Sequence, residues 1–210
     1  MAGRKQFDTD TALDQAMRVF WQRGYADASL DALGSAAGLG RGSLYGAFGN
    51  KDALFRQCLD RYASLYGARY EQALAAHPDD PVRAIEDFFE VVLDRIADPS
   101  VPTGCLIAQS AAQALTLKEE NSARVRALLD AQHQRVRAAL AGSSAGARTL
   151  DELASFVVAV NQSLAVLSRA GTPDAELRSI ARIACAKVAD TLDRPASENT
   201  GRRRSTPEAD

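Results

Sequence analysis

The sequence has few of the residues that build catalytic or metal sites. Its 210 residues include two histidines, His77 and His133, and three cysteines, Cys58, Cys105 and Cys185. Neither histidine has a histidine or cysteine partner at metal-ligand spacing, so we expect both at the surface. The cysteines are too dispersed for a metal site and too few for a disulfide scaffold. Phosphate loops, nucleophile elbows and dinucleotide fingerprints are missing too, so we expect no enzyme, metal or cofactor.

Aromatic residues and net charge are also scarce. Aromatic residues make up 6% of the chain, and its formal net charge is -2. Alanine and leucine dominate, which favours helix over strand. Residues 1–51 hold six basic and five acidic side chains, whereas the rest holds 19 basic and 22 acidic ones. Charge therefore neither supports nor excludes a nucleic-acid partner.

Long apolar runs are the third absence. We expect none to approach the length of a membrane span, and the N-terminus lacks the apolar core of a signal peptide. With 46% hydrophobic and 25% charged residues, the composition is ordinary for a globular protein. We therefore expect no membrane partner and a cytoplasmic location.

Residues 29–51 are the most informative segment and predict two short helices joined by a glycine turn. Ser29 is a good N-cap for the first helix. Gly38 supplies the left-handed backbone that ends it. The second helix is expected from about Arg41 to Phe48. This is the layout of a helix-turn-helix that reads DNA.

The side chains expected on the outside of this segment are suited to DNA. Arg41 lies near the start of the second helix, where it can make a bidentate contact to guanine. Lys51 opens the next helix, whose free backbone N–H groups and ammonium would bind a phosphate. The alternative is that Tyr45 and Lys51 merely cap and cover a small three-helix domain. The predicted DNA-binding residues are Ser29, Gly40, Arg41, Gly42, Ser43, Tyr45, Gly46 and Lys51.

The segment and its flanks resemble the TetR family of transcriptional repressors over roughly the first quarter of the chain. One departure is that the family often has a large aromatic residue and a histidine after the tyrosine, where this chain has Gly46 and Ala47. The helix would then read bases through fewer side chains, or depend more on phosphates and DNA shape. The matching segments are ALDQAMRVFWQRGY at 12–25, Ser29, AAG at 36–38, GSLY at 42–45 and FGNKDAL at 48–54.

The rest of the chain reads as successive helices. Apolar spacing and breakers predict helices over 50–76, from Pro81 through Ile96, over 105–115 and over 118–141, and two more near Leu150–Leu167 and Leu177–Leu192. We therefore predict an all-α fold with an N-terminal three-helix DNA-binding domain and a C-terminal helical bundle. The predicted boundaries are 6–66 for the helix-turn-helix domain, 67–193 for the effector-binding and dimerisation domain, and 194–210 for a disordered tail.

The last two helices predict a contact with a second subunit. Their apolar residues recur at spacings of three and four, and further apolar residues widen the stripe beyond one face. The resemblance implies that these helices pair with their copies in a homodimer; the alternative is that they lie inside a monomer core. The predicted interface residues are Leu153, Val157, Val160, Leu164, Leu177, Ile180, Ala184 and Val188.

An effector pocket is expected between the middle helices. Its wall should combine apolar surface with hydrogen-bonding groups. Cys105 also stands at the expected start of a helix, whose dipole favours the thiolate. The resemblance implies that some relatives sense electrophiles or oxidants through such a cysteine; the alternative is a small buried residue at a helix junction. The predicted pocket residues are Phe88, Phe89, Val92, Cys105, Gln109 and Asn161.

Together these features predict a homodimeric DNA-binding regulator. In the simplest scheme it is a repressor that a small-molecule effector releases from a palindromic double-stranded operator. Two alternatives remain open. One is a thiol-based redox or electrophile sensor acting through Cys105. The other is a helical small-molecule carrier whose helix-turn-helix has lost DNA binding.

Overall fold

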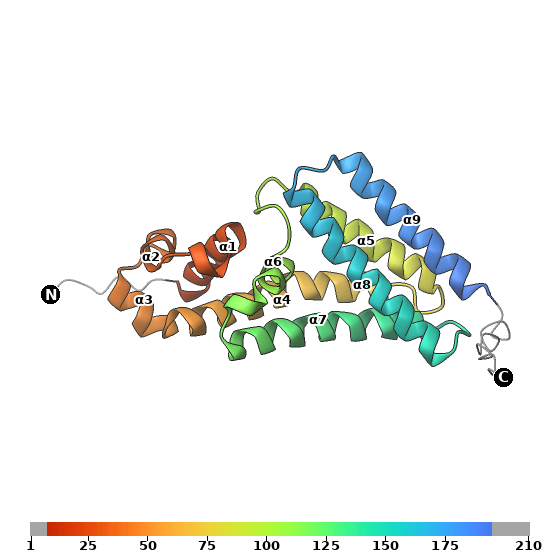
Figure 1. Cartoon of the computed structure of the whole chain (residues 1–210), viewed down its shortest axis with the longest axis horizontal. Helices are drawn as coiled ribbons and strands as arrows, with labels where there is room; N and C mark the ends of the chain where they lie inside the picture. The colour runs from red at the N-terminus through yellow and green to blue at the C-terminus, as the bar shows by residue number, and fades with distance from the viewer. Residues whose placement is uncertain (1–7, 195–210) are drawn as a thin grey trace, which may run out of the picture.

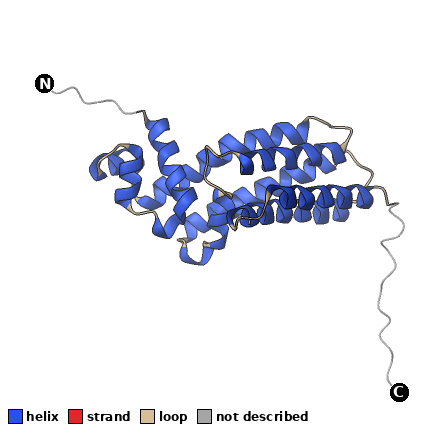
Figure 2. Cartoon of the chain, turned by 90° about the horizontal axis from the view of Figure 1, so that it is seen from above, coloured by secondary structure: helices blue, strands red, loops and turns tan. Residues whose placement is uncertain are grey.

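The computed structural model describes residues 8–194, and every regular element in that range is helical (Figures 1 and 2). The all-α prediction is confirmed for this part of the chain. Three helices form an N-terminal unit at one end: α1 (Thr9–Asp27) and the two short helices α2 (Leu30–Ala37) and α3 (Arg41–Phe48). Of the predicted tail, only Arg194 lies within the described residues.

The long helix α4 (Lys51–Ala75) runs from the N-terminal unit into a body of further helices (Figure 1). Asn50 caps it by accepting a hydrogen bond from the N–H of Ala53 at 2.9 Å. The body consists of α5 (Pro81–Ala97), α6 (Leu106–Ala112), α7 (Glu119–Leu140), α8 (Ala147–Arg169) and α9 (Asp174–Leu192). The single helix predicted over 105–115 was wrong in detail, because α6 ends at Ala112 and a 3-10 turn (Ala114–Thr116) follows.

Two hydrophobic clusters hold the molecule together, and α4 contributes to both. The N-terminal cluster includes Trp21 and Tyr62, and the body cluster includes Tyr70. Tyr66 packs against both clusters, so the predicted boundary at 66/67 falls beside a shared residue and stays a prediction. Leu128 of α7 belongs to the N-terminal cluster. The N-terminal unit is therefore packed directly onto the body.

Helices α8 and α9 use most of the predicted interface residues for this chain's own core. Val160 and Ile180 are partly buried. The other six predicted interface residues are buried within the single chain, so the prediction that they contact a second subunit is corrected. Their regularly spaced stripe packs against this chain's own helices. Phe156 and Val166, on a different face of α8, are exposed. The residues buried within the single chain are Leu153, Val157, Leu164, Leu177, Ala184 and Val188.

Helix α8 is apolar enough to match a membrane span in composition. An 18-residue window of it has a mean hydropathy of 1.4, so the expectation that no apolar run approaches that length was wrong. The helix packs against α7 and α9. Only 39% of the window is buried inside the chain. The composition thus reflects a core-facing stripe together with a second apolar face that this chain leaves uncovered.

Candidate DNA-binding surface and its connection to the body

Two glycines set the turn between α2 and α3. Gly38 ends α2 with a left-handed backbone at φ 67°. The N–H of Leu39 then donates to the carbonyl oxygen of Gly34 at 2.8 Å. A Cβ at position 34 would lie 2.7 Å from the carbonyl oxygen of Leu39, so only glycine fits this approach. Sequence analysis missed Gly34, because a lone glycine inside a helix does not reveal which backbone passes beside it.

The predicted cap and the predicted contact residues lie on the outside of this unit. Ser29 caps α2 by accepting a hydrogen bond from the N–H of Ala32 at 3.1 Å. Leu44 of α3 is buried, whereas Ser43 and Tyr45 are exposed. Because the two sides of α3 differ in this way, its polar side is available to a partner outside the chain.

Glycines 40, 42 and 46 leave the backbone of α3 uncovered. An added Cβ at any of these three positions would meet no atom within 4 Å. The chain's own packing therefore does not require glycine there. Uncovered backbone of this kind allows a groove wall or a phosphate to approach closely.

Arg41 is held by a neighbouring acid rather than pointing freely into solvent. Its Nη2 donates to Oδ1 of Asp31 at 2.8 Å, and the two side chains are 61% and 82% exposed. This hydrogen bond raises the pKa of Arg41. Exposed ion pairs are weak, so the guanidinium can exchange Asp31 for another acceptor at small cost. Sequence analysis missed Asp31, because its proximity to Arg41 depends on how α2 and α3 cross.

Lys51 contacts the N-terminal unit as well as solvent. Its Nζ lies 4.6 Å from the ring centroid of Tyr25 and 3.4 Å from the carbonyl oxygen of Ala26. Burial lowers the pKa of Lys51. The predicted phosphate contact and the predicted covering role are therefore compatible at this residue, since a partly buried ammonium over an aromatic face retains donors for an anion.

A buried carboxylate joins the start of α4 to the body. Asp52 accepts hydrogen bonds from the hydroxyl of Tyr25 at 2.6 Å, from Nζ of Lys118 at 2.6 Å and from Nδ2 of Asn121 at 2.8 Å. Burial raises the pKa of Asp52, but the hydrogen bonds from Lys118, Tyr25 and Asn121 outweigh it and lower the pKa overall. The network connects α1, α4 and α7 directly beside Lys51.

A second connection forms where α1 is interrupted at Gly24. The backbone there has φ 80° and ψ 174°, which is not helical. The N–H of Tyr25 donates to Oε1 of Gln113 at 3.0 Å instead of continuing the helix. A Cβ at Gly24 would lie 2.5 Å from the amide of Gln113, so the glycine lets the body approach α1 closely.

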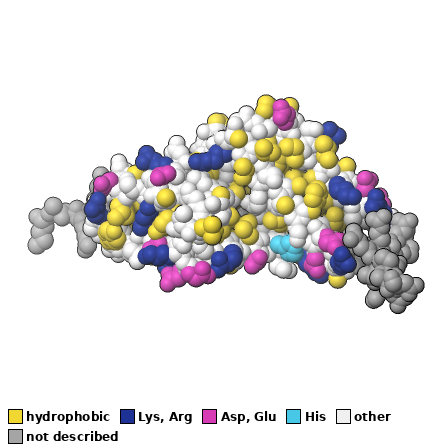
Figure 3. Space-filling model, viewed as in Figure 1, with side chains coloured by type: hydrophobic (Ala, Val, Ile, Leu, Met, Phe, Trp, Pro, Cys, Tyr) yellow, Lys and Arg dark blue, Asp and Glu magenta, His cyan; other side chains and the backbone are white. Residues whose placement is uncertain are grey.

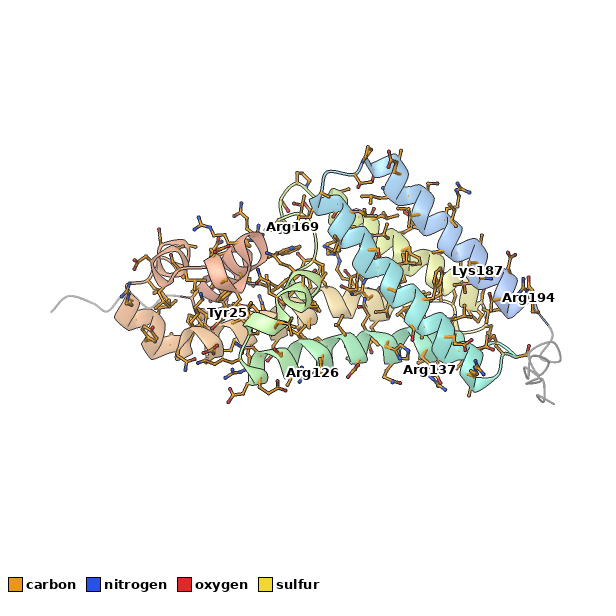
Figure 4. All side chains as sticks on the ribbon, in the orientation of Figure 1. Tyr25, Arg126, Arg137, Arg169, Lys187 and Arg194 are labelled. Carbon is orange, nitrogen blue, oxygen red and sulfur yellow. The ribbon has the colours of Figure 1, made fainter. Side chains whose placement is uncertain are left out.

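Arg169, the last residue of α8, completes this connection (Figure 4). Its guanidinium donates to the carbonyl oxygens of Trp21 at 3.2 Å and Gln22 at 2.6 Å, and to Oε1 of Gln109 at 3.0 Å. The interruption at Gly24 exposes these carbonyl oxygens near the end of a helical segment, where cations bind favourably. The far end of α8 is therefore fixed to the N-terminal unit.

A small cavity lies between α4, α5, α7 and α8. It encloses about 30 Å³, room for roughly one or two water molecules. Asn161 Oδ1 and Gln162 Oε1 are buried without a hydrogen-bond partner among the described residues. The lining residues include Tyr62, Tyr66, Tyr70, Phe88, Gln132 and Arg135.

The predicted pocket residues divide between this cavity and other places. Phe88, Cys105 and Asn161 line the cavity. The prediction is corrected for the other three. Phe89 lines a groove between α5 and α9, and Val92 is fully buried in the body cluster. Gln109 binds Arg169 at the α1 connection, because α6 turns its polar side toward the N-terminal unit. The cavity tyrosines were missed, since their spacing along α4 resembles ordinary packing.

Cys105 lies at the edge of the cavity and is half-buried. The hydroxyl of Tyr62 donates to its Sγ at 3.3 Å. Cys58 and Cys185 are buried, and burial raises the pKa of the Cys58 thiol and raises that of Cys185 to about 11. Within residues 8–194 no three His, Cys, Asp or Glu side chains are grouped to hold a metal ion.

Comparison with known proteins fits this geometry. The sequence profile of the bacterial regulatory proteins of the tetR family matches residues 12–58. The chain is 31% identical over 185 residues to the HTH-type transcriptional repressor ComR of Escherichia coli K12, covering 84% of this chain and 87% of ComR. The chain belongs to the TetR family. It is a DNA-binding transcriptional regulator with the α1–α3 unit as its helix-turn-helix domain.

Solved structures extend the comparison to the body of this TetR-family chain. A cysteine mutant of the TetR-family regulator CifR, complexed with 26-base-pair operator DNA, is 32% identical, with a TM-score of 0.77 over 87% of this chain and 97% of CifR. A TetR regulator from Chloroflexus aurantiacus is 23% identical with a TM-score of 0.75, covers 86% of this chain and 93% of its own, and supports the fold alone. Both likenesses include the helical body, so the fold prediction is confirmed beyond the N-terminal unit.

Proposed function

We propose that this TetR-family protein is a homodimeric repressor that leaves its operator when a small molecule occupies the cavity between α4, α5, α7 and α8. The observation that carries the proposal is the continuity of α4. This single helix provides cavity walls at Tyr62, Tyr66 and Tyr70 and begins at Lys51 beside the DNA-binding surface. An effector that displaces this helix at the cavity therefore also displaces the helix-turn-helix unit.

The exposed side of α3 is the proposed contact with double-stranded DNA. Arg41 would exchange Asp31 for a guanine edge, and Ser43 and Tyr45 would bind phosphate or base. Lys51 would bind a backbone phosphate at the start of α4. The remaining predicted residues, Ser29, Gly40, Gly42 and Gly46, would let the backbone approach the duplex. CifR, 32% identical to this chain, is solved in complex with operator DNA, which supports double-stranded DNA as the partner.

A second copy of the chain would cover the exposed apolar face of α8 and α9. Hydrophobic side chains gather over these helices in Figure 3. On α8, Phe156 and Val166 are 36% and 58% exposed, and on α9 Ile183 is 60% exposed. A two-fold pair of such subunits would present its α3 helices to two half-sites of a palindrome. We expect the dimer to act in the cytoplasm, where its operator is.

The protein would leave its operator because the effector binds more tightly to one arrangement of the helix-turn-helix unit and the body than to the other. Because the cavity encloses only about 30 Å³, an effector of more than a few atoms binds only when α4 or α7 moves. A coupling free energy of about 1–3 kcal/mol would lower operator affinity roughly 5- to 150-fold. The Asp52 and Arg169 connections are the places where such movement would reach the N-terminal unit.

The first test is a selection of random duplexes by purified full-length protein. We expect a palindromic motif, bound specifically at moderate salt. Arg41→Ala should weaken this binding by about 5- to 150-fold and relax preference at one base position, whereas Arg124→Ala on α7 should leave it unchanged. Recovery of no enriched motif would instead favour a helical small-molecule carrier without DNA function.

A second candidate is release through a thiol. The contact of the Tyr62 hydroxyl with Cys105 Sγ at the cavity edge favours it, because a modified sulfur would displace Tyr62 and with it α4. Operator release by an alkylating electrophile should then be lost in Cys105→Ser and retained in Cys58→Ser. Release by the electrophile in both variants would contradict the thiol mechanism.

A further inference from the structure

Arg95 of α5 is a buried cation without an acidic partner among the described residues. It is 3% exposed, and no Asp or Glu carboxylate within residues 8–194 lies within ion-pair distance of it. Its Nε donates to the hydroxyl of Tyr70 at 2.9 Å, and its Nη1 donates to the carbonyl oxygen of Gly104. Its Nη2 is buried with no partner in the described part of the chain. A buried charge without a carboxylate partner is costly.

The cation lies directly behind the wall of the cavity. Tyr70 and Cys105 line that cavity, and Tyr70 is the residue that Arg95 binds. Because the Tyr70 oxygen accepts from Arg95, its own proton remains to be donated, and no acceptor for it occurs among the described residues. Two donors, Arg95 Nη2 and the Tyr70 hydroxyl, are therefore unused in the same region.

The charged side chains at the cavity favour an anion over a cation, whereas the unpaired Asn161 Oδ1 and Gln162 Oε1 could accept from a donor elsewhere on the same ligand. Arg135 is the charged residue in the described cavity lining, which includes no Asp or Glu, and its Nε lies 3.7 Å from Oε2 of Glu71 outside that lining. Burial opposes the charge on Arg95, but the oxygens of Tyr62 and Tyr70 favour it, and the pKa of Arg95 is raised overall. The larger groove between α5 and α9 differs, because its acids and bases, such as Arg178 and Glu90, pair with each other.

We propose that the effector is a small aromatic acid whose carboxylate binds Arg95 and the hydroxyl of Tyr70. Its ring would lie among Tyr62, Tyr66 and Phe88, which supply an aromatic wall. The inference rests on the proposed effector role of the cavity and adds the chemical class of the ligand. The carboxylate would accept hydrogen bonds from Arg95 Nη2 and from the Tyr70 hydroxyl, because Nε and Nη1 of Arg95 already donate to Tyr70 and Gly104.

The same contact would connect the ligand to the DNA-binding unit. The guanidinium carbon of Arg95 lies 5.9 Å from the ring centroid of Trp21 in α1. Trp21 also provides a carbonyl oxygen to Arg169. A carboxylate that draws Arg95 toward the cavity therefore removes a cation from the face of a buried α1 side chain, beside the connection that fixes α8 to α1.

The test compares benzoate, benzamide and benzamidine, which have nearly the same shape but carry a negative, neutral and positive group. Purified full-length protein is titrated with each ligand, and its thermal unfolding midpoint is recorded. We expect a saturable rise with benzoate, at a concentration about tenfold lower than with benzamide. Benzamidine should give none. The proposal is overturned if benzoate has no saturable effect, or if either other ligand matches it.

Variants then assign the charge preference to one side chain. Arg95→Met should remove the preference for benzoate over benzamide, because a buried cation is replaced by an apolar chain of similar length. Arg83→Met changes an exposed arginine of the same helix and should retain the preference. Persistence of the preference in Arg95→Met would contradict the proposal. The comparison of ligands on the unmodified protein stands even if that variant does not fold.

Operator binding separates this inference from the proposed function. Without ligand, the selected duplex should bind the protein whatever the effector is. Benzoate should then release it, and benzamidine should not. Saturable benzoate binding without release would preserve the acid site and contradict effector-driven release. Operator binding with no benzoate effect of any kind would preserve the regulator and overturn the acid site.

Discussion

At the scale of single residues, the Arg41 guanidinium can donate either to Asp31 of the same chain or to an acceptor on DNA. Asp31 holds the guanidinium in the free protein, and DNA would offer phosphates or guanine in its place. The carboxylate also stands on the surface that would face a polyanion, where it repels phosphates. Asp31 is thus expected to reduce the affinity of Arg41 for DNA by a small factor.

Asp31→Asn should bind the selected duplex about 2- to 5-fold more tightly at low salt, because a weak competing pair is lost. The gain should shrink as salt rises, since exposed charges are screened. Fluorescence anisotropy at two salt concentrations measures it. Asp60→Asn breaks a comparable exposed pair with Arg124, far from α3, and serves as the control. Equal affinities of wild type and Asp31→Asn would rule out the competition.

Asp52 gives the chain an acid-sensitive connection. Its native pKa is lowered by its three donors, so its contribution to stability is complete above the unfolded-state value of about 4 and is lost as pH falls through the native pKa. Asp52→Asn should reduce the free energy of unfolding by about 1–3 kcal/mol at pH 7. The difference from wild type should shrink below about pH 4. Denaturant unfolding at several pH values checks this, and an undiminished difference would contradict it.

At the scale of helices, substitutions at two glycines distinguish an effect on stability from an effect on DNA binding. Gly34 is closely packed, whereas Gly46 faces open space. Gly34→Ala forces a Cβ onto the Leu39 carbonyl and should destabilise the protein by about 1–3 kcal/mol. Gly46→Ala places a Cβ in open space within a helix and should raise stability by about 0.5–1 kcal/mol. If the backbone of α3 approaches DNA, Gly46→Ala should still lower operator affinity. Circular dichroism melting and anisotropy measure the two effects.

Sequence patterns predicted the helices well because caps and breakers are local. Ser29 caps α2 and Gly38 ends it, as the sequence predicted. The interruption of α1 at Gly24 and the contact at Gly34 depend on which distant backbone lies nearby, and no local pattern contains that information. The same reason explains the interface residues. Regular spacing identified a buried stripe on α8 and α9, but not whether the partner was this chain or a second one.

At the scale of the whole molecule, the uncovered apolar face of α8 and α9 predicts the oligomeric state. If the chain dimerises through this face as proposed, Phe156→Glu combined with Ile183→Glu should give a monomer, because the double substitution places charges in an apolar contact. Light scattering during gel filtration measures the mass. Leu65→Glu alters an exposed apolar residue of α4 and should leave the dimer intact. An unchanged mass in the double variant would place the interface elsewhere.

The near-absence of free space around Tyr62 and Tyr70 also has a kinetic consequence. If a ligand binds there as proposed, it can enter only while the surrounding helices are separated, so the rate of this opening limits the rate of binding. In a rapid-mixing experiment, the observed rate should level off with rising ligand concentration rather than increase in proportion to it. The delay between the arrival of a chemical signal and the transcriptional response would then be a property of the protein rather than of the supply of the signal.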